Sequence, residues 1–200
     1  MRRSVLRALS TSCLLVLVLA KSAGAEWHFT PMVGVTFLGK TSAPTDTDLA
    51  AGNVHRNFGG SVSLLGSGIF GAEGLVVWTP GFLTGDLDLV RKSRSIAFMG
   101  NVMVTTPRRW TEYSLRPFVS GGFGVMTASK TEFREVFPLN RDIPAFNVGG
   151  GAIGFLSKNT GLRFDFRYFS SFTRYHEAAS ETDPLHMRYM TASVGVVIRR

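Results

Sequence analysis

The chain has 200 residues, and its 22 Lys and Arg against 14 Asp and Glu give a formal net charge of +8 at pH 7. Cys13 is its only cysteine, which excludes an internal disulfide and any metal site built from several thiolates. The length fits one domain, and the basic residues form no stripe of the kind that binds nucleic acid.

The first 25 residues are typical of a secretory signal peptide. Arg2, Arg3 and Arg7 precede an apolar run, residues 14–20, which is followed by small residues at 23–25. The run is too short for a transmembrane helix, which needs about 20 residues. We expect cleavage before Glu26, leaving residues 26–200 as the mature domain. Removal of residues 1–25 also removes Cys13 and four basic residues, which halves the formal net charge. A buried amphipathic first helix is the alternative.

Beyond residue 26 the chain shows no helical periodicity of useful length, and glycine is abundant, with 22 in the full sequence. Large apolar residues alternate with small or polar ones, as in a β-strand, whose successive side chains point to opposite faces. Trp27 and Phe29, for example, alternate with His28 and Thr30. The pattern predicts eight strands, at about residues 27–38, 58–66, 70–82, 95–106, 115–128, 145–156, 161–172 and 187–199.

The connections between these strands alternate between long and short. Long polar segments surround Asp48, Arg91, Glu135 and Glu177, whereas the turns between them, such as the one at Lys158, are shorter. Outer-membrane barrels have an even number of strands, long external loops and short periplasmic turns. The expected strand lengths also suit a tilted membrane crossing of about 9–11 residues better than globular strands of about 5–6.

The stretch GLRFDFRYFSSF, residues 161–172, has charge on one face and bulky apolar groups on the other. In a soluble barrel the aromatic face would turn inward. In a transmembrane barrel it would meet lipid, and the charges would line the lumen. The expected strand lengths and the alternation of long and short connections favour the transmembrane interpretation.

Four stretches carry a resemblance to a known family: PMVGVTF (31–37), GAEGLVVW (71–78), LRPFVSGGFGV (115–125) and SVGVVIRR (193–200). With them the sequence resembles the eight-stranded outer-membrane β-barrels, which include the OmpA-type transmembrane domain and the opacity-like surface proteins. The resemblance implies an all-β, antiparallel up-and-down barrel in a bacterial outer membrane. Its partners would be outer-membrane lipid, lipopolysaccharide and the barrel assembly machinery. The sequence departs from the family in ending on Arg200 rather than on an aromatic residue.

This interpretation assigns the prominent side chains to three groups. A lumen charge network contains Glu73, Arg116, Arg163, Asp165 and Arg167, the lipid face contains Phe98, Phe123, Leu162, Phe164, Phe166 and Tyr168, and the interface aromatics are Trp27, Trp78, Trp110 and Tyr113. The charged residues could line a gated pore, or they could pair with one another and form a polar plug that closes the lumen. We favour the plug, because barrels of this size fill their interior with side chains.

No catalytic set, metal site or cofactor is expected. Residues 169–172 can be compared with the His-x-Ser-Asn motif of lipid A deacylases, but Phe169 stands where the base should be, and Ser171 without a base is a weak nucleophile. We therefore expect a non-enzymatic structural or surface-interaction protein whose external loops bind an unknown partner. The alternatives are a narrow porin-like channel for small solutes and a secreted soluble barrel that binds a small apolar ligand.

Overall fold

The computed structural model describes residues 26–42, 54–66, 68–82, 90–107, 115–132, 139–172 and 186–200. The expected signal peptide lies outside these residues. Within them, no helix is long and apolar enough to cross a membrane.

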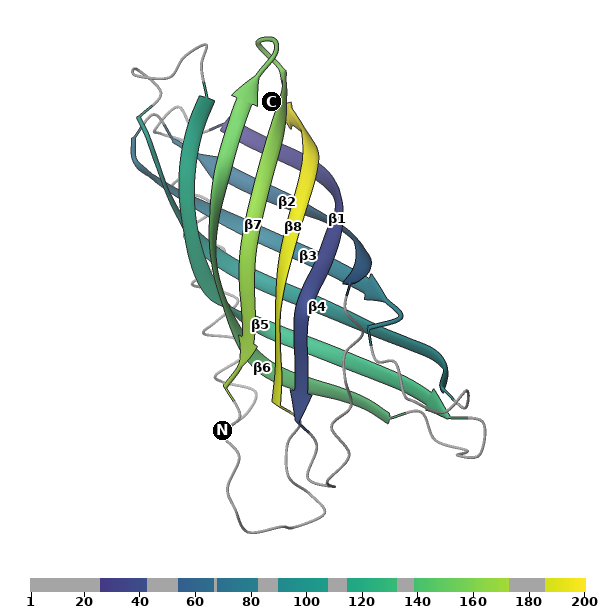
Figure 1. Cartoon of the computed structure of the whole chain (residues 1–200). Coiled ribbons are helices and arrows are strands. Elements are labelled where there is room, and N and C mark those ends of the chain that lie inside the picture. The colour runs from purple at the N-terminus through teal and green to yellow at the C-terminus, as the bar shows by residue number, and fades with distance from the viewer. Residues whose placement is uncertain are drawn as a thin grey trace.

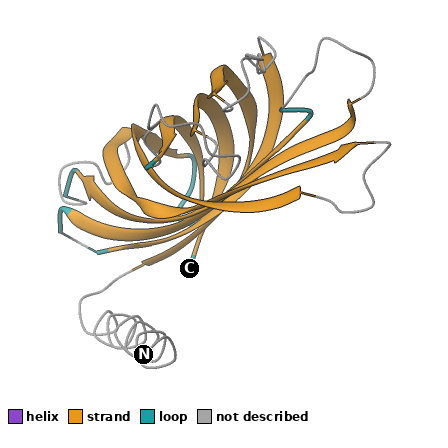
Figure 2. Cartoon of the chain, turned by 90° about the horizontal axis from the view of Figure 1, so that it is seen from below, coloured by secondary structure: helices purple, strands orange, loops and turns teal. Residues whose placement is uncertain are grey.

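Eight strands close into one antiparallel barrel, as predicted (Figure 1). They are β1 (Glu26–Ser42), β2 (Val54–Leu65), β3 (Phe70–Pro80), β4 (Val90–Thr105), β5 (Leu115–Glu132), β6 (Leu139–Phe155), β7 (Thr160–Ser171) and β8 (His186–Arg199). Each strand pairs with its neighbours in sequence, and β1 pairs with β8 to close the wall. In the view of Figure 2, all of the regular structure in the described part of the chain is strand.

Several strands extend further than predicted toward the long connections. The segment around Arg91 was expected to be a loop, but it belongs to β4, which begins at Val90, and β6 begins at Leu139 rather than near 145. These extensions contain few bulky apolar residues, so the period-two signal fades although the backbone pairing continues. The prediction therefore found each strand but placed these ends wrongly.

The barrel has two different ends. One end, the short-turn end, carries the connections between β2 and β3, between β4 and β5, and between β6 and β7, together with the C-terminus, at the top of Figure 1. There the backbone N–H groups of Trp27 and Arg200 each donate to the other residue's carbonyl oxygen, both at 2.9 Å. The other end, the long-loop end, carries the four remaining connections.

Side chains fill the lumen in three layers. An apolar cluster near the short-turn end consists of Leu65, Met103, Phe118, Ile153 and Val197. A second cluster, toward the long-loop end, consists of Met32, Leu75, Val77, Phe82, Ala97, Met99, Met126, Ile143, Ala145, Phe169, Met187 and Tyr189. Charged and amide side chains lie between them. An inward glycine makes room there: a Cβ on Gly149 would come within 2.5 Å of the Arg167 side chain.

Candidate functional site

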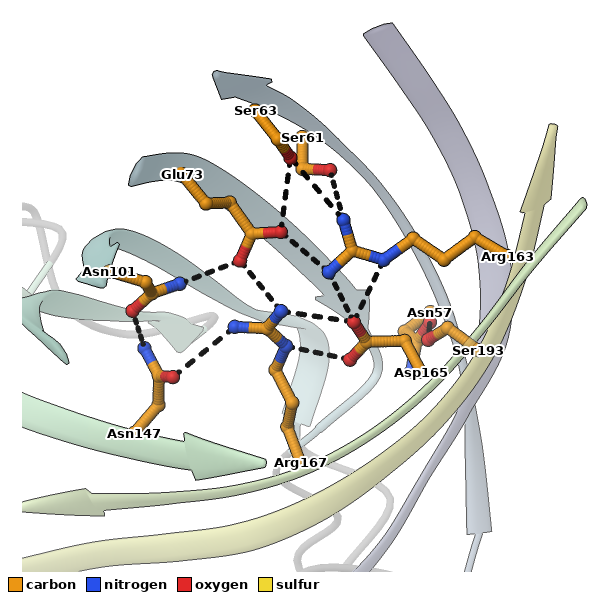
Figure 3. Close-up of polar contacts among 10 residues, drawn as sticks. All are labelled: Asn57, Ser61, Ser63, Glu73, Asn101, Asn147, Arg163, Asp165, Arg167 and Ser193. Atoms are coloured by element: carbon orange, nitrogen blue, oxygen red, sulfur yellow. Dashed lines mark hydrogen bonds and ion pairs between the residues drawn. The ribbon is translucent and has the colours of Figure 1, made fainter. Parts of the chain in front are cut away.

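The middle layer of the lumen brings together four of the five predicted charges. Arg163, Asp165 and Arg167 lie at alternate positions of β7 and therefore all point inward, toward Glu73 on β3 (Figure 3). The exposed fraction is 1% for each arginine, 3% for Glu73 and 6% for Asp165. All four are thus buried from solvent inside the wall.

Each carboxylate contacts both arginines. Glu73 lies 2.5 Å from the Arg163 guanidinium and 2.6 Å from that of Arg167. Asp165 lies 2.6 Å from each of the same two groups. The four side chains form a closed ring of ion pairs in which two positive and two negative charges balance.

Polar side chains from three other strands surround this ring. Arg163 donates to Ser61 at 3.1 Å, Asn101 donates to Glu73 at 2.9 Å, and Arg167 donates to Asn147 at 3.3 Å. Asn147 also donates to Asn101 at 2.7 Å, which links β6 to β4. A buried ion pair is stable only when further hydrogen bonds satisfy the charged atoms, and these neighbours supply them.

Arg116, the fifth predicted member, points into the barrel but lies nearer the short-turn end. Its guanidinium donates to the carbonyl oxygens of Thr106 at 2.9 Å and of Gly66 at 3.3 Å. These bonds tie together two of the connections at that end. Membership of the charge network was assigned to Arg116 from its inward parity alone, and parity does not determine height along the barrel.

The structure places the predicted lipid-facing residues on the outer wall. Phe98, Phe123, Phe164 and Phe166 expose 53%, 69%, 55% and 50% of their surface. Leu162 and Tyr168 point the same way but are half-buried by neighbouring side chains. The ring of Tyr168, for instance, meets that of Phe146 edge-on at 6.3 Å.

Two of the four predicted interface aromatics lie in the described part of the chain. Trp27 is the second residue of β1, at the short-turn end, and Trp78 lies near the end of β3 at the long-loop end, with 39% and 44% exposure. They therefore mark opposite edges of the apolar wall. Trp110 and Tyr113 lie outside the described residues.

Sequence reasoning missed the uncharged half of this interior. It did not identify the amide and hydroxyl partners of the ring, nor the chain in which Ser193 donates to Asn57 at 3.2 Å and Asn57 donates to Thr36 at 3.1 Å. It also missed the methionine-rich apolar cluster near the long loops. The available signal was the same alternation, because these residues share the inward parity of their strands, except for Phe82, which lies just beyond the end of β3.

Ser171, the serine that was compared with the deacylase motif, lies at the long-loop end of β7. Its hydroxyl accepts a hydrogen bond from the Met187 backbone N–H at 3.1 Å. Phe169 is buried, stacked on Tyr189 with ring centroids 5.0 Å apart. In the described ranges, no group of three or more His, Cys, Asp or Glu side chains could hold a metal ion.

A scan against protein-family models finds no match, and a search of curated proteins finds none either. Solved structures do match. Neisserial surface protein A, NspA, superimposes with a TM-score of 0.57 at 11% identity, over 88% of this chain and 98% of its own. OprG of Pseudomonas aeruginosa gives 0.56 at 11% identity over 89% and 96%. AlkL, solved in lipid bilayers, gives 0.52 at 13% identity over 89% and 91%. The chain thus has the fold of the eight-stranded outer-membrane β-barrel proteins.

Proposed function

We propose that this protein is a non-enzymatic integral protein of a bacterial outer membrane whose barrel anchors external loops at the cell surface. The proposal rests on which side chains face outward and which face the lumen. Large aromatic side chains such as Phe123 and Phe166 are exposed on the outside, while Arg163 and Arg167 are enclosed. Water would favour the reverse arrangement, whereas lipid around the barrel favours this one.

The filled lumen favours an anchor over the narrow porin-like channel. A conducting pore needs a continuous aqueous path, but the ring of ion pairs spans the interior and neutralises its own charge. Apolar clusters lie on both sides of it, Phe118 toward the short turns and Phe169 toward the long loops. An ion would have to cross an apolar layer on either side of the ring, where its loss of hydration is not repaid.

The proposed role therefore rests on the loops. NspA is named a surface protein, and OprG is an outer-membrane protein. We infer the same location for this chain, with both ends of the mature barrel on the periplasmic side and the long connections outside. Outer-membrane lipid and lipopolysaccharide would surround the wall, and the assembly machinery would insert it. The loops would contact a partner at the cell surface.

Membrane extraction and conductance measurements test this proposal. We expect the protein to sediment with outer membranes and to remain there after washing with high salt or carbonate. Purified barrels in planar bilayers should give no steady single-channel current. Release by carbonate would contradict the membrane location, and a reproducible current in the wild type, altered in an Arg167→Gln variant, would support the channel instead.

The orientation gives a separate prediction. Because residues 26–200 contain no cysteine, single cysteines can report exposure without background. A membrane-impermeant maleimide should label Glu177→Cys, in the last long connection, on intact cells. It should label Lys158→Cys, in the turn between β6 and β7, only after the outer membrane is opened. Labelling of Lys158→Cys alone on intact cells would reverse the orientation.

A further inference from the structure

The described side chains of the outer wall include exposed charges at one end of the strands. Among strand residues whose side chains are described, five charged ones are exposed: Lys40, Arg56, Arg94, Asp142 and Arg188. All five lie toward the long-loop end of their strands. Four of them are cations, on β8, β1, β2 and β4, and we refer to these four as the basic arc.

Lys40 reaches the outer wall because of an irregularity in β1. Residue pairing shifts between Phe37, which lies opposite Met190, and Lys40, which lies opposite Arg188. Three steps along β1 thus correspond to two along β8, and Leu38 takes a positive φ of 51° within this bulge. Without the extra residue, Lys40 would lie opposite Met187 and point into the apolar interior. A bulge of this kind re-aims a side chain, and here it turns a cation outward.

The bulge sets two like charges side by side. Lys40 and Arg188 are direct cross-strand partners, an arrangement that is unfavourable by itself. In the described ranges, no carboxylate forms an ion pair with either side chain or with Arg56 or Arg94. An anion placed between the two cations would remove the repulsion.

Aromatic residues fix the depth of the arc. Phe58 and Trp78 are cross-strand partners with ring centroids 5.9 Å apart, and each lies close to one residue of the basic arc. Arg56 lies two residues before Phe58, and Arg94 lies opposite Pro80, two residues beyond Trp78. Aromatic girdles lie at the level of lipid head groups. The cations therefore border the apolar wall and point sideways, toward the surrounding leaflet.

The rest of this end is different. On β5, β6 and β7 the outer wall carries clustered rings, with Phe172 lying 5.7 Å from Phe123 and 5.3 Å from Phe146. The acidic Asp142 on this side accepts a hydrogen bond from Thr127 at 2.6 Å. Among the strand residues of the outer wall whose side chains the structure describes, positive charge is thus confined to one arc.

We propose that the basic arc binds the phosphate groups of a phosphorylated glycolipid in the surrounding leaflet, with Lys40 and Arg188 holding one phosphate between them. This rests on the proposed function, which places the long-loop end in the outer leaflet. A lipid is favoured over a soluble polyanion because the cations project from the wall beside the apolar belt, where only a membrane component lies alongside.

The test measures lipid preference around the inserted barrel. The barrel is folded into phosphatidylcholine vesicles with traces of dansyl-labelled, bis-phosphorylated lipid A, and energy transfer from its tryptophans gives the association relative to dansyl-labelled phosphatidylcholine. Lys40→Gln/Arg188→Gln is compared with Lys158→Gln/Arg200→Gln, which removes the same charge from the short-turn end. We expect the first variant to lower the relative association by about tenfold or more, with the control unchanged. The preference should also fall as salt is raised.

Other outcomes decide against the site. Equal loss in both double variants, or equal binding of dephosphorylated lipid A, would show that no phosphate site exists on the arc. Complete displacement by millimolar pyrophosphate would show a soluble ligand rather than a lipid. A wild-type barrel that inserts, shown by its heat-sensitive gel mobility, but has no lipid preference overturns this proposal alone. A wild-type chain that never enters vesicles overturns the proposed function as well.

Discussion

Replacing Glu73 by Gln is expected to destabilise the barrel by about 3 to 5 kcal/mol, because it removes the carboxylate that contacts both buried arginines. Arg163 and Arg167 would then share Asp165 alone, which leaves one excess positive charge in a confined interior. Any water that enters the lumen would screen this charge and reduce the loss. The free energy of unfolding is measured by urea titration in lipid vesicles.

Two comparisons make this result specific. Glu26→Gln changes the same kind of group at the rim, where Glu26 is 20% exposed and lies 3.5 Å from Arg199, so the loss should stay within about 1 kcal/mol. In Glu73→Gln/Arg167→Gln the ring is neutral again, and the double variant should lose less than the sum of the two single variants. A Glu73→Gln barrel as stable as the wild type would show that the ring is not desolvated.

On the outer face, introducing a charge is expected to lower the free energy of unfolding. Phe166 lies near the middle of β7, opposite Gly150 on β6 and Ala192 on β8, and half of its surface is exposed. An arginine at that depth in lipid should cost about 2 to 4 kcal/mol, although the next residue, Arg167, is an arginine that faces the lumen. Urea unfolding of Phe166→Arg in vesicles measures this loss.

Two further variants serve as controls, one at a different depth in the membrane and one on the inward face of the same strand. Phe172→Arg carries the same change to the long-loop end of the wall and should cost about 0 to 1 kcal/mol, since the penalty falls toward the interface. Arg167→Phe should also destabilise, because it takes a cation from Glu73 and Asp165. If Phe166→Arg proved neutral while Phe166→Ala caused a large loss, the aromatic face would have to be a protein core, and the soluble-barrel alternative would hold.

The alternation of side chains determined much of this structure without any tertiary information. It predicted eight strands, their order and the two faces of β7, because the inward or outward direction of a strand residue depends only on its parity. It could not predict the bulge in β1, since a bulge is defined by the pairing of two strands. Strict alternation along β1, without the bulge, predicts that the Lys40 side chain points inward.

What only the tertiary structure decided is which inward residues meet. The partners Glu73 and Arg167 are separated by 94 positions in sequence, and their contact depends on the registers that accumulate strand by strand around the barrel. Those registers place Glu73 level with Arg163 and Arg167, and they place Arg116 nearer the short turns, among backbone carbonyls. Sequence alone therefore determined which side of the wall each residue occupies, because that is a local property of a strand. Pairing inside the lumen was decided by the closed barrel, because height and angular position arise from the strands together.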